Sequence, residues 1–184
     1  MRMKASSLNV CAWVFGLLAL TITCAGCASA PRAGESATTV VVVRHAEKEA
    51  DGARDPDLTD AGRERADELA RLCAERGVSA VYSTAYTRTI ETAAPTARRA
   101  GVRVDTSFGP GESDEMARVV LRERAGEAVL VVGHSNTVGR VVAAFGGDEI
   151  GDLPETVYDS MFVVTIAPDG GVTTERRRYG APSP

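Results

Sequence analysis

The sequence predicts an α/β fold: a three-layer sandwich in which helices cover both faces of a mostly parallel sheet. Short β-branched runs alternate with longer helical segments, as is typical of such sheets. The runs at 38–43 and 129–132 are apolar at nearly every position, as in strands buried on both faces. A Pro-Asp-Gly-Gly turn at 168–171 separates the last two strand-like segments and predicts an antiparallel hairpin at the C-terminal edge.

Local signals place each element in turn. Thr59 is the expected N-cap of the first helix and Gly77 its end, and Ser113 is the expected cap of the third helix. Pro95 should kink or split the second helix. We therefore expect strands at 38–43, 78–82, 102–106, 128–132, 160–167 and 172–178, and helices at 60–76, 86–100, 113–124 and 135–145.

Residues 1–30 have the pattern of an export segment rather than of a folded domain. Arg2 and Lys4 precede an uncharged apolar run that is too short for an ordinary membrane span. Small residues before Cys27 resemble the bacterial lipoprotein processing box, although Cys24 stands where such boxes usually carry an aliphatic residue. We expect cleavage before Cys27 and its lipidation, with soluble export or an uncleaved anchor as alternatives. Residues 31–37 would form a tether, and 38–184 the domain.

An exported, membrane-anchored bacterial lipoprotein is thus the expected form, and otherwise a periplasmic or secreted protein. Processing at Cys27 would leave Cys73 as the domain's lone cysteine, which suits a small apolar residue on a helix better than a catalytic thiol. The formal charge of −4 would become about −6 after loss of Arg2 and Lys4, which argues against a nucleic-acid partner.

The chain has only two histidines, and each follows a predicted buried strand. His45 stands in Arg-His-Ala-Glu-Lys and His134 in Gly-His-Ser-Asn-Thr. The carboxyl ends of parallel strands form the ligand-binding crevice of open α/β sheets. An imidazole there can attack phosphorus and form a phosphohistidine, provided that fixed positive charge surrounds the phosphoryl oxygens. Arg44 and Arg88 can supply that charge.

These motifs resemble those of the histidine phosphatase superfamily, also called the phosphoglycerate mutase-like family. The resemblance runs from about Val40 to Thr165 and includes the segment from Ser83 through Arg88 to Thr92-Ala93. It implies that His45 is the nucleophile, that Arg44, Arg88 and His134 bind the phosphoryl group, and that no metal or other cofactor is needed. Asn136 would order the His134 loop or cap its helix, where backbone N–H groups at 135–137 would face the crevice.

The general acid is less clearly marked. Many relatives place a glutamate after the third strand, and Glu112 is the nearest match, with Asp114 as second choice. Some small relatives that act on phosphohistidine have no such acid. Glu47 and Lys48 are interpreted as structural residues, and the arginine run at 176–178 as an exposed edge strand that discourages pairing with other chains.

The expected function is a phosphatase that hydrolyses a phosphomonoester or a related phosphoryl donor, on a phosphorylated small-molecule substrate, through a phosphohistidine on His45. One alternative is a phosphohistidine protein phosphatase, although the export segment weighs against it because its known relatives are cytoplasmic. Another is a lipoprotein that binds a phosphate ligand without turnover. A mutase is disfavoured because the domain is close to minimal length.

Overall fold

The computed structural model describes residues 36–183. The export segment, the tether up to position 35 and Cys27 lie outside the described residues, and the expectations for them stay predictions. Within the described part, no helix is both long and apolar enough to cross a membrane.

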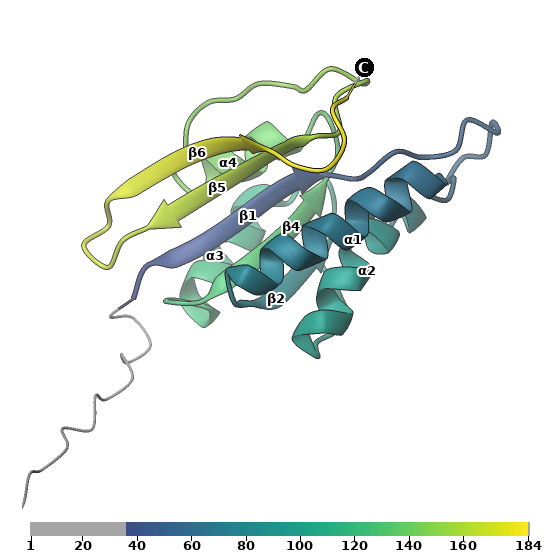
Figure 1. Cartoon of the computed structure of the whole chain (residues 1–184). Helices are drawn as coiled ribbons and strands as arrows, with labels where there is room; N and C mark the ends of the chain where they lie inside the picture. The colour runs from purple at the N-terminus through teal and green to yellow at the C-terminus, as the bar shows by residue number, and fades with distance from the viewer. Residues whose placement is uncertain (1–35, 184) are drawn as a thin grey trace, which may run out of the picture. The chain divides into compact units, whose positions relative to one another are not determined.

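The described chain folds around one six-stranded sheet with the order β3-β2-β4-β1-β5-β6. Strands β1, β2, β3 and β4 run parallel to one another, whereas β5 pairs antiparallel with both β1 and the edge strand β6. The strands are β1 (Thr38–Arg44), β2 (Val78–Ser83), β3 (Val104–Asp105), β4 (Ala128–Gly133), β5 (Ser160–Ile166) and β6 (Val172–Arg178). The predicted edge hairpin is confirmed (Figure 1).

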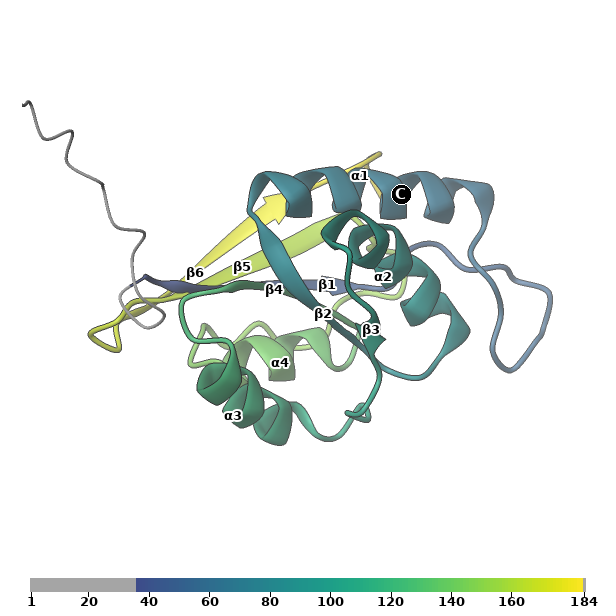
Figure 2. The same cartoon turned by 90° about the horizontal axis from the view of Figure 1, so that it is seen from below.

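Four helices form the outer layers of the sandwich: α1 (Asp60–Glu75), α2 (Thr87–Ala100), α3 (Ser113–Glu123) and α4 (Val138–Ala144). Figure 2 shows α1 and α2 on one side of the sheet and α3 and α4 on the other. Consecutive side chains of β1 point to opposite faces of the sheet, because side chains alternate along a strand. Val40 and Val42 pack in the core that contains residues of α3 and α4, whereas Val41 and Val43 pack in the core that contains residues of α1 and α2. The predicted α/β fold class is confirmed.

The boundaries of several elements differ from those expected. Pro95 does not split α2, which runs unbroken through it. Proline removes a single backbone donor, and the buried residues Thr92 and Ala93 before it and Thr96 and Ala97 after it hold the helix against the core.

Three further differences concern the ends of elements. The third strand is short, because only Val104 and Asp105 pair with β2. Ser113 is the first residue of α3 rather than its cap, and no side chain caps that helix. The last helix begins at Val138 instead of 135, since the Thr137 N–H donates to the His134 carbonyl within a tight turn (3.0 Å). The Thr59 cap of α1 is confirmed by its bond from the Gly62 N–H (3.0 Å).

Gly62 allows the first turn of α1 to touch the segment that follows β1. A Cβ at this position would overlap the Glu47 carbonyl oxygen. We predict that Gly62→Ala destabilises the protein by about 1–3 kcal/mol, although alanine favours helices, because neither backbone segment can retreat without disturbing the sheet. The urea-unfolding midpoint measures the effect. Gly111→Ala, whose Cβ would meet open space, is the matched control. Equal midpoints for the two variants would contradict the prediction.

Candidate active site

The two histidines meet at the carboxyl ends of adjacent parallel strands. Strands β1 and β4 pair in a register that sets Arg44 beside Gly133, so that the next residue of each chain segment is a histidine. The His45 N–H donates to the Gly133 carbonyl (2.9 Å) and extends this pairing by one step. The two imidazole centroids lie 5.6 Å apart. The sequence-based expectation that His45 and His134 share one crevice is therefore confirmed.

A hollow of about 480 Å³ opens over the histidines. Its walls come from the loops after β1, β3 and β4, from the start of α2 and from the 146–159 loop. The residues that line it are His45, Lys48, Tyr86, Arg88, Pro110, His134, Ser135, Asn136 and Glu155. Of the residues predicted from the sequence, four line this cavity, whereas Arg44 and Glu112 do not.

His45 is held as a neutral imidazole with one free nitrogen. Its Nδ1 lies 2.8 Å from the Ala46 carbonyl oxygen, and since a carbonyl can only accept, Nδ1 carries the proton. Nε2 is consequently the unprotonated nitrogen. Burial lowers the pKa of His45 to about 3, opposed by the Ala46 bond and reinforced by the nearby cationic arginines. The imidazole is therefore uncharged and nucleophilic at neutral pH.

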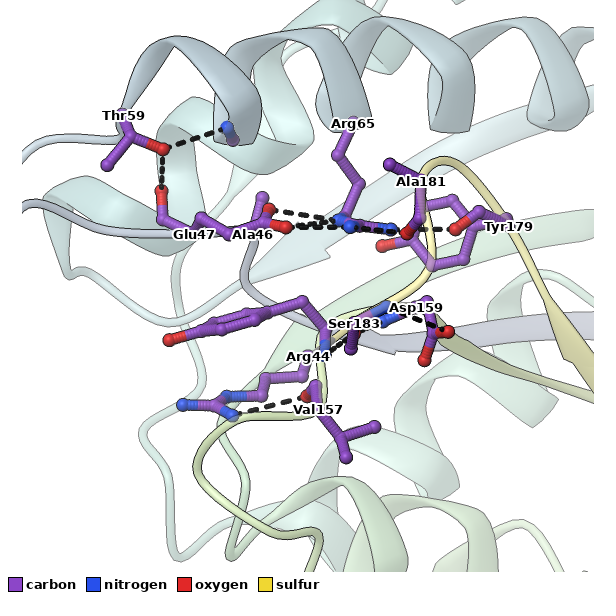
Figure 3. Close-up of polar contacts among 12 residues, drawn as sticks. Arg44, Ala46, Glu47, Thr59, Arg65, Val157, Asp159, Tyr179, Ala181 and Ser183 are labelled. Carbon is purple, nitrogen blue, oxygen red and sulfur yellow. Dashed lines mark hydrogen bonds and ion pairs between the residues drawn. The ribbon is translucent and has the colours of Figure 1, made fainter.

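Arg44 is almost fully buried (1% exposed) and anchors a loop. Its guanidinium donates to the carbonyls of Pro154 (3.1 Å), Glu155 (2.6 Å) and Val157 (3.2 Å), and it pairs with the Glu155 carboxylate (2.6 Å). It also stacks over the Tyr158 ring at 4.3 Å. Figure 3 shows the side chain reaching Val157. The phosphate-binding role of Arg44 stays a prediction, because its terminal nitrogens are engaged by this loop.

Arg88 lies in the first turn of α2 and does line the cavity. Asp55, from the loop after β1, accepts from the Arg88 guanidinium (3.2 Å) and from the Thr87 N–H and hydroxyl (3.0 and 2.8 Å). It thereby caps the start of α2, where Tyr86 offers no side-chain cap. The Thr87 N–H, chiefly, lowers the pKa of Asp55. Sequence reasoning missed this aspartate because nothing in the polar loop marks its partner.

His134 is neutral as well. Its Nε2 lies 2.9 Å from the buried Thr84 hydroxyl. Burial lowers the pKa of His134 to about 4, and Arg88 and Arg44 contribute in the same direction. An anion bound beside it would raise that pKa, because opposite charge favours the imidazolium form. Asn136 lines the cavity with an exposed side chain, and α4 has no side-chain cap, so the capping alternative is wrong for Asn136.

Glu155 and Lys48 line the cavity, and sequence reasoning assigned neither of them to the site. Glu155 is its only carboxylate-bearing residue and accepts from the Ser135 hydroxyl as well as from Arg44. The Ser135 bond, and after it Arg44, hold the pKa of Glu155 below its ordinary value. It is ionised at neutral pH. Lys48 was interpreted as structural, but it is a cavity-lining, half-buried cation.

Glu112 lies outside the cavity lining, so the structure does not bring it together with the histidines. Its carboxylate turns back onto its own loop and accepts from the Gly109 N–H (2.6 Å), because the Gly-Pro-Gly sequence lets the chain fold tightly there. Asp114, in the first turn of α3, is not among the lining residues either. The geometry gives neither residue support as the general acid.

Glu47 has the structural role that was predicted. It accepts three hydrogen bonds from the buried Arg65 guanidinium, at 2.6–3.1 Å, and Arg65 also donates to the carbonyls of Tyr179 (2.7 Å) and Ala181 (2.8 Å). Figure 3 shows this cluster joining the segment after β1, helix α1 and the C-terminal segment. Among residues 36–183, no group of three or more histidine, cysteine or acidic side chains is arranged to hold a metal ion.

Comparisons with known proteins agree with this arrangement. Residues 40–109 match the model of the histidine phosphatase superfamily (branch 1). No curated protein matches the chain. Similar solved structures include the protein histidine phosphatase SixA in complex with tungstate, which is 19% identical with a TM-score of 0.60 over 76% of this chain and 96% of that one. YhfR of Bacillus stearothermophilus is 19% identical, with a TM-score of 0.58 over 77% and 96% of the chains.

A mycobacterial glucosyl-3-phosphoglycerate phosphatase is 14% identical, with a TM-score of 0.55 over 79% of this chain and 99% of that one. At such identities these likenesses concern the fold. The fold and the site together define a class of α/β domains in which two histidines meet, beside arginines, at the ends of adjacent parallel strands. The stretch that matches the model of the histidine phosphatase superfamily (branch 1) holds both His45 and Arg88.

The low pKa values of both histidines predict acid sensitivity. In the unfolded chain each would bind a proton near its ordinary value of 6.5, whereas the folded protein resists protonation down to about 3 for His45 and about 4 for His134. The unfolded state thus binds more protons below 6.5, and the free energy of unfolding falls as pH decreases. We expect a loss of about 2 kcal/mol for each histidine between pH 7 and pH 5.

Urea unfolding at several pH values checks this expectation. His45→Asn and His134→Asn should each remove roughly half of the slope. This window lies above the ordinary pKa of the carboxylates, so their titration contributes little to it. A free energy of unfolding that stays constant from pH 7 to pH 5 in the unmodified protein would contradict the prediction.

Proposed function

We propose that this protein is a metal-independent phosphatase that hydrolyses a phosphomonoester or a related phosphoryl donor through a phosphohistidine on His45. The observation that carries the proposal is the state of His45. Its Nδ1 proton is committed to the Ala46 carbonyl, and its pKa is about 3, so Nε2 keeps its lone pair at neutral pH. Arg88 and His134 line the same cavity.

The reaction divides into two displacements at phosphorus. In the first, Nε2 of His45 forms a bond to phosphorus as the ester oxygen leaves with the electron pair of its P–O bond and takes up a proton. In the second, a water oxygen bonds to phosphorus, the P–N bond breaks, and the water gives up a proton. Inorganic phosphate is released and His45 returns to its neutral form.

The surrounding cations stabilise the negative charge of the phosphoryl oxygens. Arg88 offers planar N–H donors to phosphoryl oxygens, and Asp55 holds it in place from the side. His134 gains a proton more easily once an anion is bound, and then adds a further positive charge. Arg44 is assigned to the same phosphoryl group, for which it would have to exchange its Glu155 partner for a phosphoryl oxygen.

Two other functions compete with this one. Dephosphorylation of protein phosphohistidine is favoured by the likeness to SixA, named as a protein histidine phosphatase. Phosphohistidine needs no strong acid for its leaving group, and Glu112 lies outside the cavity. A phosphate-binding protein without turnover is the other alternative. Parallel assays with a panel of phosphorylated metabolites and with a phosphohistidine peptide decide between a small-molecule substrate and protein phosphohistidine.

His45→Ala should abolish release of phosphate from an aryl phosphate, because it removes the imidazole whose free Nε2 attacks phosphorus, whereas Nε2 of His134 lies against the Thr84 hydroxyl. The unmodified protein should form an acid-labile, alkali-stable phosphoenzyme when it is quenched during turnover. Arg88→Gln should lower kcat/KM by on the order of 10²–10³, as the loss of one preorganised donor does elsewhere.

Arg98→Gln is the matched control for Arg88→Gln, since Arg98 is an exposed arginine in the last turn of the same helix. It should retain full activity. Phosphate release by His45→Ala at the unmodified rate would refute the enzyme mechanism, and binding of phosphate without any turnover would support the non-catalytic alternative.

Glu155→Gln should tighten the binding of inorganic phosphate several-fold. The ionised carboxylate repels the anion and occupies Arg44, so its removal is worth on the order of 1 kcal/mol. Product inhibition measures the constant. Glu112→Gln should change neither this constant nor the rate with an alkyl phosphate. A weaker binding of phosphate by Glu155→Gln would show that Glu155 assists binding, and a slower alkyl reaction in Glu112→Gln would restore its role as general acid.

A further inference from the structure

Helix α2 carries a row of buried threonines. Thr89, Thr92 and Thr96 follow one another at helical spacing, and their side chains are at most 2% exposed. A buried hydroxyl is costly unless its hydrogen-bonding capacity is used. The first two hydroxyls are fully used, whereas Thr96 Oγ1 has no hydrogen-bond partner. The difference suggests that Thr89 and Thr92 have a task that Thr96 does not share.

Thr92 holds the residue that orients His45. Its hydroxyl donates to the Arg88 carbonyl (2.7 Å), which leaves its lone pairs free to accept from the Ala46 N–H (2.9 Å). Ala46 is fully buried, and its own carbonyl accepts the Nδ1 proton of His45 (2.8 Å). Thr92 therefore fixes the backbone at Ala46, and through it the ring that has to attack in line with the leaving group.

Thr89 acts on His134 through a second hydroxyl. The Thr89 hydroxyl lies 2.8 Å from the Tyr86 carbonyl and 3.0 Å from the Thr84 carbonyl, and since both can only accept, its single proton goes to these carbonyls. The Thr84 hydroxyl, 2.8 Å away, must then donate to Thr89. Thr84 is left to accept from Nε2 of His134 (2.9 Å). This chain of donors fixes the proton of His134 on Nε2 and leaves Nδ1 as the nitrogen available to a ligand.

We propose that Thr92 and the Thr84–Thr89 pair are positioning residues that hold the two imidazoles in opposite tautomers. His45 carries its proton on Nδ1 and attacks with Nε2, whereas His134 carries its proton on Nε2 and meets the phosphoryl group with Nδ1. The functional half of this inference rests on the proposed phosphatase activity, but the tautomers themselves do not depend on it. Both hydroxyl arms come from α2 or from the turn just before it, so the helix that carries Arg88 also sets both rings.

Nitrogen-15 NMR of the histidine side chains tests the proposal directly. Because the chain has only two histidines, untagged full-length protein labelled at histidine shows two imidazole rings without background. At pH 7 both rings are neutral, and long-range proton–nitrogen spectra identify the protonated nitrogen of each. We expect one ring of each tautomer. Thr92→Val should disturb the ring of His45 alone, and Thr84→Val or Thr89→Val that of His134 alone.

Activity provides the second readout. Thr92→Val should lower kcat on the order of tenfold to a hundredfold, as misplacement of a reacting group does. Thr84→Val should act mainly on KM, since His134 binds the phosphoryl group. Thr92→Ser and Thr84→Ser should restore both tautomer and rate, because they return the hydroxyl. Thr96→Val is the matched control, a buried threonine of the same helix whose hydroxyl has no partner, and should leave both rings and both constants unchanged.

An unchanged His45 tautomer together with an unchanged kcat in Thr92→Val would overturn the role of Thr92. Retention of the His134 tautomer in Thr84→Val would overturn that of the hydroxyl pair. If valine prevents folding at a position, Thr→Ala at that position carries the same test. An unmodified protein that hydrolyses no phosphate compound but shows the expected tautomers would refute the phosphatase and leave the positioning role intact.

Discussion

The parallel pairing of β1 with β4 is the constraint on which the rest of the structure depends. Residues 40–43 and 129–132 are buried on both faces of the sheet, and they pair residue by residue from Val40 with Val129 to Val43 with Val132. That fixed register sets Arg44 opposite Gly133 and therefore places His45 beside His134. Every other group of the site comes from a loop or helix end that converges on this point, as ligand sites do at the carboxyl ends of parallel strands.

A site that concentrates positive charge must be stable when no anion is bound. The two imidazoles add no repulsion to the arginines because they remain uncharged, with pKa values far below 6.5. Arg44 is balanced by Glu155 and three loop carbonyls, and Arg88 by Asp55. The loops at 49–56 and 146–159 therefore hold the two arginines in place, whatever they also contribute to the choice of substrate. Each loop contributes one carboxylate that pairs with one of the two arginines, and an anion that binds the same arginine has to compete with that carboxylate.

Much of this could be predicted from the sequence, and the exceptions share one cause. Buried strands, helix ends and the two histidine motifs have local signatures, so the fold, the strand-end crevice and the positions of His45 and His134 were predictable. Asp55 and Glu155 lie in irregular loops, where no periodicity reveals which arginine a carboxylate will meet. Glu112 shows the same limit: its place after the third strand suggested an acid, but the sequence does not reveal that its carboxylate accepts from the Gly109 N–H of its own loop.

In the Arg-His-Ala-Glu-Lys motif, residues that line the cavity are interspersed with residues that anchor the segment to the rest of the domain. His45 and Lys48 line the cavity. Arg44 points into the 154–157 loop, Ala46 is fixed by α2, and Glu47 binds Arg65 of α1. The three anchoring residues tie the segment to three separate parts of the domain, so that the backbone cannot rotate His45 away from its neighbour. The motif thus combines two positions that line the cavity with three that anchor the segment, and Arg44 could reach a ligand only by giving up contacts with its loop.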